Sequence, residues 1–194
     1  MNKLSIAAAA IVFALGSASA FADDVGLITF DGAVTDTTCT ITTNNGVDAN
    51  NVTITMPVVK VSEVEEATTD TGGVGSKEFE LHLSGCPTTL TKASATFTSQ
   101  QFAELSNGTL KTDPSVAGHA ENVSLALYNN GSSNTDRIEV GLPANNTQTA
   151  TLDEGVGVLA YRVAYVPSAD WVKGTTDITA GKVSSNATFT MSYE

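Results

Sequence analysis

The sequence is short of cationic and aromatic side chains. Nine Lys and Arg residues stand against 21 Asp and Glu, which gives a formal net charge of −12, and aromatic residues make up 6% of the chain. Nucleic acids and anionic membranes repel a surface this acidic, so we expect neither as a partner. The many Thr, Ser, Asn, Gly and Val residues favour a secreted all-β domain over a helical one.

Side chains and motifs typical of catalytic and metal-binding sites are equally scarce. The two histidines, His82 and His119, lie far apart in the sequence and form no zinc or copper motif. No G-x-S-x-G sequence and no phosphate-binding glycine loop occurs. One acidic group lacks the alternating spacing of a calcium loop: Glu63, Glu65, Glu66 and Asp70. We therefore expect no enzyme, no cofactor and no metal site.

The N-terminus has the layout of an export signal. Lys3 precedes an apolar run from Leu4 to Leu15, and small residues follow, with possible A-x-A cleavage sites ending at Ala20 and Ala22. The run is shorter than a membrane span, although an N-terminal anchor is the alternative. We expect a signal peptide over residues 1–22, and its removal with Lys3 changes the formal charge from −12 to −13.

Two cysteines, Cys39 and Cys86, remain in the exported chain. An even number in an oxidising compartment favours one disulfide over two free thiols. In the chain-entropy model, closing this loop would stabilise the fold by about 4 kcal/mol.

Short alternating runs separated by turn-rich segments recur along the rest of the chain, and these predict many β-strands. The run 155–166 is longer and more apolar, so we expect it in the centre of a sheet. Pro57 divides residues 51–61 into two short segments, and residues 62–76 form a loop with at most one helical turn. The polar link 100–122 has partial helix as an alternative. Together these patterns predict one antiparallel sandwich of immunoglobulin type.

The chain ends in an alternating run, residues 187–193. One row faces the core: Ala187, Phe189, Met191 and Tyr193. Because Glu194 follows directly, no later strand is available to cover this one. An apolar sheet edge left open in this way is an aggregation hazard unless a partner fills it. If this strand is the sixth of the sandwich rather than the seventh, the core has an open groove.

Three motifs, taken in order behind a signal peptide, then indicate a family. They are "GLITFDGAV" with "TDTTC" ending at Cys39, "FELHLSGC" closing at Cys86, and "ATFTMSYE" with penultimate Tyr193; Gly181 stands fourteen positions from the end. Over its whole mature length the chain resembles the pilin subunits of chaperone–usher fimbriae, most closely the major shaft subunits of type 1-like fimbriae.

This resemblance implies an immunoglobulin-like sandwich, residues 33–194, that lacks its final strand. A periplasmic chaperone would lend a strand and bind the C-terminal strand together with Glu194. At the outer-membrane usher, the N-terminal extension of the next copy or of another pilin, residues 23–32 in this chain, would replace it. The product would be a surface fimbria of a Gram-negative bacterium.

In that extension, one row would enter the groove: Gly26, Ile28, Phe30 and Gly32. Ile28 and Phe30 would each contribute roughly 1.5–3 kcal/mol if fully buried. The alternatives are a minor adaptor or terminator pilin, or a self-complete secreted β-sandwich that binds another molecule.

Overall fold

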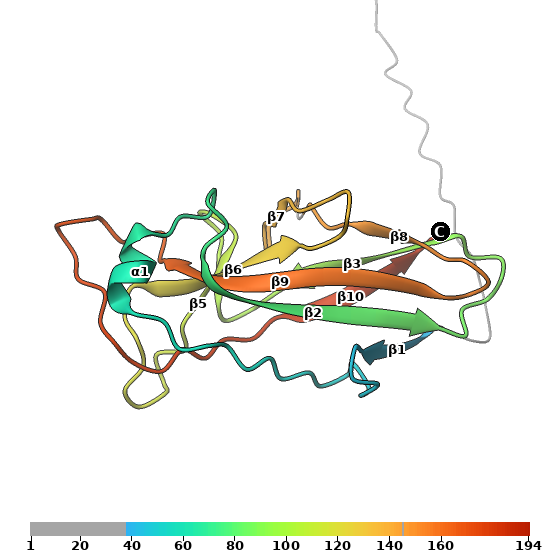
Figure 1. Cartoon of the computed structure of the whole chain (residues 1–194), viewed down its shortest axis with the longest axis horizontal. Helices are drawn as coiled ribbons and strands as arrows, with labels where there is room; N and C mark the ends of the chain where they lie inside the picture. The colour runs from blue at the N-terminus through green and yellow to red at the C-terminus, as the bar shows by residue number, and fades with distance from the viewer. Residues whose placement is uncertain (1–37, 145) are drawn as a thin grey trace, which may run out of the picture. The chain divides into compact units, whose positions relative to one another are not determined.

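The computed structural model describes residues 38–144 and 146–194. These form two antiparallel β-sheets and one short helix (Figure 1). The expected signal peptide and the row Gly26, Ile28, Phe30 and Gly32 lie outside the described residues.

The larger sheet has seven strands in the order β1-β2-β9-β6-β5-β4, with β7 paired to β6. Their bounds are β1 Thr40–Thr43, β2 Val74–Ser84, β4 Ala103–Glu104, β5 Thr109–Lys111, β6 Val123–Asn129, β7 Arg137–Ile138 and β9 Gly157–Pro167. As predicted, the run 155–166 supplies a central strand, since β9 pairs with both β2 and β6.

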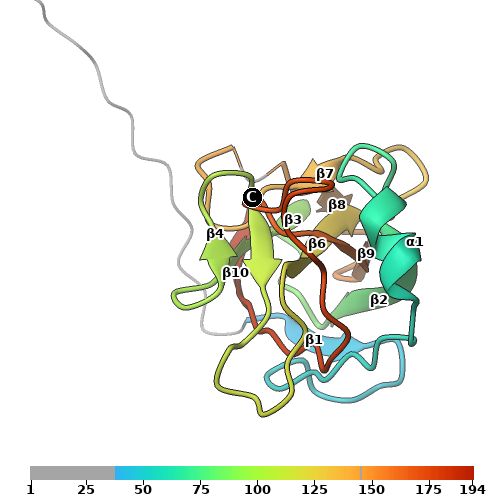
Figure 2. The same ribbon diagram turned by 90° about the vertical axis from the view of Figure 1, so that its left-hand side faces the viewer.

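The smaller sheet has three strands in the order β10-β3-β8. They are β3 Lys92–Thr98, β8 Thr149–Thr151 and β10 Thr188–Tyr193. The helix α1, Val61–Glu66, is the single helical turn expected in the loop 62–76, and it lies at one side of the sandwich in the end-on view of Figure 2. Every strand pair is antiparallel, which confirms the predicted sandwich class.

The core lies between the two sheets, and β9 gives it the longest row of buried side chains. Leu159 and Tyr161 are fully buried, and Val163 and Tyr165 follow at period two. The Tyr161 ring packs against Phe79 of β2 and, edge to face at 4.9 Å, against Phe97 of β3. These aromatic contacts tie the two sheets together.

The outer face of the larger sheet has a small core of its own. Tyr128 and Ala164 are buried there, and the Tyr128 hydroxyl donates to the carbonyl oxygen of Thr69. The Arg162 guanidinium stacks 4.0 Å from the Tyr128 ring centroid and donates to the carbonyl oxygen of Gly72. The loop that follows α1 is thereby held across this face.

The Cys39–Cys86 disulfide is present, and both cysteines are buried. It joins the residue before β1 to the residues that follow β2. The expected pairing of the two cysteines is confirmed.

Two local expectations differ from the structure. The link 100–122 contains the β4–β5 hairpin, and none of it is helical, because Gly108 at φ +72° turns the chain back after Asn107. Residues 51–60, expected as two strands around Pro57, form no ladder and run as extended chain. Proline has no backbone N–H to donate to a ladder.

Candidate functional site

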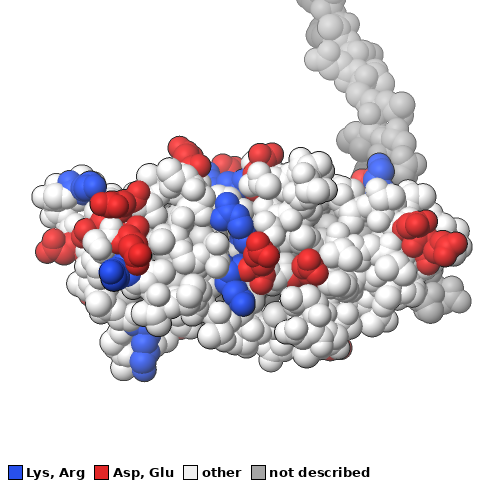
Figure 3. All heavy atoms as spheres, in the orientation of Figure 1, with Lys and Arg blue, Asp and Glu red and all other residues white. Residues whose placement is uncertain are grey.

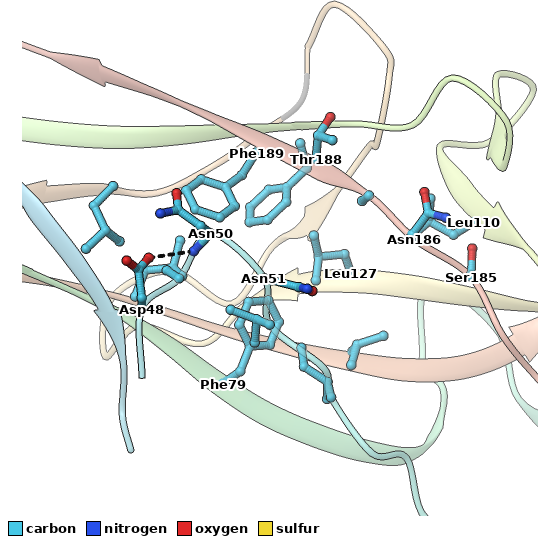
Figure 4. Close-up of a pocket in the computed structure, with 18 of the residues that line it drawn as sticks. Asp48, Asn50, Asn51, Phe79, Leu110, Leu127, Ser185, Asn186, Thr188 and Phe189 are labelled. Atoms are coloured by element: carbon cyan, nitrogen blue, oxygen red, sulfur yellow. Dashed lines mark hydrogen bonds between the residues drawn. The ribbon is translucent and has the colours of Figure 1, made fainter. Parts of the chain in front are cut away.

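A long apolar groove of about 820 Å³ lies between residues 38–56 on one side and 185–193 on the other (Figure 4). Side chains from both sheets form its floor: Phe79 and Leu81 of β2, Phe97 of β3, Leu110 of β5, Leu125 and Leu127 of β6, and Val163 of β9. The hollow therefore opens directly onto the hydrophobic core.

One wall of the groove is β10. This strand pairs with β3 along one edge, and within the described residues no strand pairs with its other edge. Its inward row, Phe189, Met191 and Tyr193, is only partly buried. The directly opposite residues of β3, Phe97, Ala95 and Ala93, are buried. The contrast marks the side of β10 that the chain leaves uncovered.

The structure places the C-terminal row largely as its alternation indicates. Phe189 and Tyr193 line the groove, and Met191 packs against the core. Ala187 also lines the groove but precedes β10 and is exposed. Burial raises the pKa of the Tyr193 hydroxyl.

Glu194 is held beside β3 at the end of the same wall. Its main-chain oxygen accepts hydrogen bonds from the N–H groups of Thr91 and Lys92, at 2.6 and 3.1 Å. Its side-chain carboxylate lies 3.3 Å from the Lys92 ammonium. These contacts fix the end of β10 in register with β3.

The opposite wall is a stretch that sequence reasoning did not assign to the site. Residues 51–59 are extended, and Val52, Ile54 and Met56 turn toward the core while their neighbours face solvent. The Tyr165 hydroxyl donates to the carbonyl oxygen of Pro57 and anchors the stretch. The alternation of "VTITM" was the available signal, but it predicts a paired strand equally well.

A polar side chain lies at each end of the groove. Asp48 lies at one end, where its carboxylate accepts from the N–H of Asn50 at 2.9 Å (Figure 4). Leu110 and Ser185 lie at the other end, and the Ser185 hydroxyl is buried without a hydrogen-bond partner in the described chain. Both ends are polar, and the floor between them is apolar.

Gly181 allows a close backbone contact just before the β10 wall of the groove. A Cβ atom at this position would lie 2.5 Å from the backbone of both His119 and Ala120. The Ala120 N–H donates to the carbonyl oxygen of Lys182 at 2.8 Å. Glycine is therefore required here by the close approach of two backbones.

The remaining polar groups lie away from the groove. His82 forms a 2.6 Å pair with Glu80 on the solvent face of β2. Figure 3 shows Lys and Arg beside Asp and Glu across that face, where Glu78 is in register with Arg162. Among the described residues there is no cluster of three or more metal-binding side chains, and no helix long and apolar enough to cross a membrane.

Comparison with known proteins places this geometry in a family. The family model described as fimbrial protein matches residues 28–194. The chain is 27% identical to the F17 fimbrial protein of Escherichia coli over 187 residues, covering 94% of this chain and 95% of that protein. It is 29% identical to long polar fimbria protein A of Salmonella typhimurium over 197 residues, covering 100% of this chain and 98% of that protein.

Among solved structures, one similar chain is the CupB6 tip adhesin from Pseudomonas aeruginosa. The TM-score is 0.45 at 19% identity, and the match covers 60% of this chain and 30% of that longer one. The family match spans both cysteines, both groove walls and the Gly181 contact. The chain belongs to the fimbrial protein family.

Proposed function

We propose that this chain is the repeating structural subunit of a fimbria, and that it polymerises by donating residues 23–32 to the groove of another copy. One observation carries the proposal. An apolar groove that opens onto the core is flanked by two backbone segments, β10 and residues 51–59, whose facing edges form no ladder.

A strand is the occupant that suits such a groove. Main-chain groups on the two facing edges are hydrogen-bonding partners for an added backbone, and every second side chain of the added strand reaches the floor. Chaperone–pilin complexes are the known example of this mode of binding. Burial of an apolar row would remove the exposed edge that otherwise invites aggregation.

The donor segment has a suitable length. Ser185 to Tyr193 spans nine residues, about 27 Å when extended, and residues 24–32 have the same number. In an antiparallel arrangement with Gly32 opposite Ser185, Phe30 lies beside Ala187, Ile28 beside Phe189 and Gly26 beside Met191. Phe30 then faces the small side chain of Ala187, Gly26 leaves room for Met191, and Ile28 packs against Phe189.

The same groove would be occupied before assembly. We infer that a periplasmic chaperone binds β10 and Glu194 until an outer-membrane usher adds the next copy or another pilin of the same fimbria. The subunit would reach the cell surface of a Gram-negative bacterium by this route. Its role is structural, without catalysis, cofactor or metal.

The test is a pair of double substitutions in the donor segment. Ile28→Asp with Phe30→Asp places two carboxylates against the apolar floor, so polymerisation should stop while chaperone binding persists. Leu27→Asp with Thr29→Asp, on the outward row, is the matched control and should still polymerise. Size-exclusion chromatography and electron microscopy supply the readout.

Two outcomes would contradict the proposal. One is a stable wild-type monomer whose fold is unaffected by removing residues 23–30. The other is loss of chaperone binding along with polymerisation in the inward double variant, because the segment would then belong to the subunit's own fold.

A further inference from the structure

We propose that Asn45 is a modification site, at which spontaneous deamidation converts the side-chain amide into a carboxylate while the protein stays folded. The sequence has three Asn–Gly pairs, which begin at Asn45, Asn107 and Asn130. Glycine favours this reaction, because it has no Cβ atom to hinder attack by its backbone nitrogen. The reaction requires no partner subunit, and the fold holds the three pairs in very different ways.

Water is the only other reactant that deamidation needs. The Gly46 backbone nitrogen loses its proton and attacks Asn45 Cγ, so that an N–Cγ bond forms. The Cγ–Nδ2 bond breaks, Nδ2 leaves as ammonia after taking up a proton, and a cyclic succinimide remains. Water then adds to one of the two ring carbonyl carbons. Opening at Cγ gives aspartate, and opening at the main-chain carbon gives isoaspartate.

Asn45 lies in the exposed turn that follows β1 (Figure 1). Its side chain makes no hydrogen bond within the described chain, and no atom lies within 4 Å of the place where a Gly46 Cβ would be. The Gly46 N–H donates to the carbonyl oxygen of Thr43 at 2.8 Å, and this bond has to open before the nitrogen can attack. Water can take its place, while the hydrogen bond from the Thr43 N–H to the Val47 carbonyl oxygen keeps the hairpin closed.

Asn107, in the β4–β5 hairpin, is held much more firmly. Its side-chain oxygen accepts from the Thr109 N–H at 3.1 Å and lies 2.8 Å from the Thr109 hydroxyl oxygen. The Gly108 N–H donates to the carbonyl oxygen of Glu104 at 2.6 Å. Gly108 is buried, and a Cβ atom there would lie 2.6 Å from the Cα of Glu139. Attack on the Asn107 amide therefore requires the whole hairpin to open.

Asn130, at the start of the β6–β7 turn, is tied to the larger sheet. Its N–H donates to the carbonyl oxygen of Ala160 in β9 at 2.8 Å. Gly131 and Asn134 exchange two backbone hydrogen bonds, at 3.0 and 3.3 Å. The Gln148 side-chain oxygen lies 2.5 Å from the place where a Gly131 Cβ would be. The Gly131 nitrogen cannot reach the Asn130 amide without breaking these contacts.

Deamidation at Asn45 would change the turn in two ways. A new carboxylate would join Asp48 in a stretch without Lys or Arg, since neither occurs between Cys39 and Val59. Isoaspartate would also lengthen the main chain of the turn by one carbon. Because ammonia is lost, the change is irreversible, and the modified fraction increases with the age of the folded protein.

Peptide mapping tests the proposal. The protein, in the state of assembly in which it is purified, is incubated in mildly alkaline buffer, digested and analysed by mass spectrometry. The Asn45 peptide should deamidate at least roughly tenfold faster than the Asn107 and Asn130 peptides, because those two must first lose protected hydrogen bonds. In denaturant the three rates should become similar. Equal rates in the folded protein, or an unmodified Asn45, would overturn the proposal.

Two glutamine substitutions supply matched controls. Asn45→Gln keeps the amide, but its attack would form a larger ring, so deamidation of this peptide should be lost. Labelling by an isoaspartate methyltransferase should disappear with it. Asn130→Gln should leave both signals unchanged. Isoaspartate labelling that persists in Asn45→Gln at the wild-type level would contradict the assignment.

Discussion

Strands β9 and β10 have similar alternating sequences but different surroundings. β9 pairs on both edges, and its inward residues Leu159 and Tyr161 are fully buried. β10 pairs only with β3 among the described strands, and its inward residues Phe189 and Met191 stay partly exposed. The difference lies in the neighbours that the fold supplies rather than in the pattern itself.

The comparison separates two kinds of core residue. Side chains on β9 gain their full burial energy when the chain folds, at roughly 25 cal/mol per Å² of apolar surface removed from water. Side chains on β10 gain part of it on folding, and under the proposed function they gain the rest when another strand arrives. A substitution on β9 and one on β10 should therefore respond differently when a donor strand binds.

The largest effect is expected from Leu159→Ala. In the non-polymerising Ile28→Asp, Phe30→Asp background, it should lower the free energy of unfolding by about 2–5 kcal/mol, with or without a peptide of residues 23–32. Phe189→Ala should cost clearly more with the peptide bound than without it. Denaturant titrations under both conditions measure this. Equal costs for Phe189→Ala in the two states would break the comparison.

An intermediate effect is expected at Gly181, where the chain approaches β10. The added methyl group of Gly181→Ala meets the backbone of His119 and Ala120, so the substitution should cost about 1–3 kcal/mol of stability. Gly174→Ala is an informative control: its Cβ would meet no atom within 4 Å, and its cost comes from φ +78° alone. A smaller loss for Gly181→Ala than for Gly174→Ala contradicts the steric explanation.

The smallest effect is expected for Tyr161→Phe on β9. The Tyr161 hydroxyl is buried without a hydrogen-bond partner in the described chain, and burial raises the pKa of this group. Removing the hydroxyl should be neutral or slightly stabilising near pH 7.

The raised pKa of Tyr161 also sets how stability changes with pH. Below the ordinary tyrosine pKa of about 10, both folded and unfolded states keep the proton. Above it the unfolded state loses the proton first, so stability falls as pH rises. Thermal melts between pH 8 and 11.5 should show a shallower alkaline loss for Tyr161→Phe than for wild type, and an identical loss would refute this account.

The sequence predicted the sandwich, the disulfide and the central position of β9, because each follows from a local pattern or an even cysteine count. It predicted the inward row of β10 for the same reason. The second wall was missed, because "VTITM" alternates like a paired strand and only the folded chain reveals that its edges form no ladder. Leu110 was missed as well, since a three-residue strand such as β5 has too little sequence to show a period.

Gly181 is a residue whose position was predicted to matter but whose structural role was not. Its position was noticeable in the sequence, but the reason for it is the approach of the backbone at His119 and Ala120, more than sixty residues earlier. A contact between such distant segments leaves no periodic trace. Only the fold explains why a side chain is excluded there.

The Cys39–Cys86 bond also determines how the domain carries a mechanical load. A pull on the chain before Cys39 reaches the disulfide before it reaches β1, whose ladder with β2 has only four registered pairs. The bond passes the force to the end of β2, an eleven-residue strand that is hydrogen-bonded to β1 and β9. Under the proposed function, tension between neighbouring subunits is therefore borne by β2, and the short edge strand β1 is spared from being peeled away.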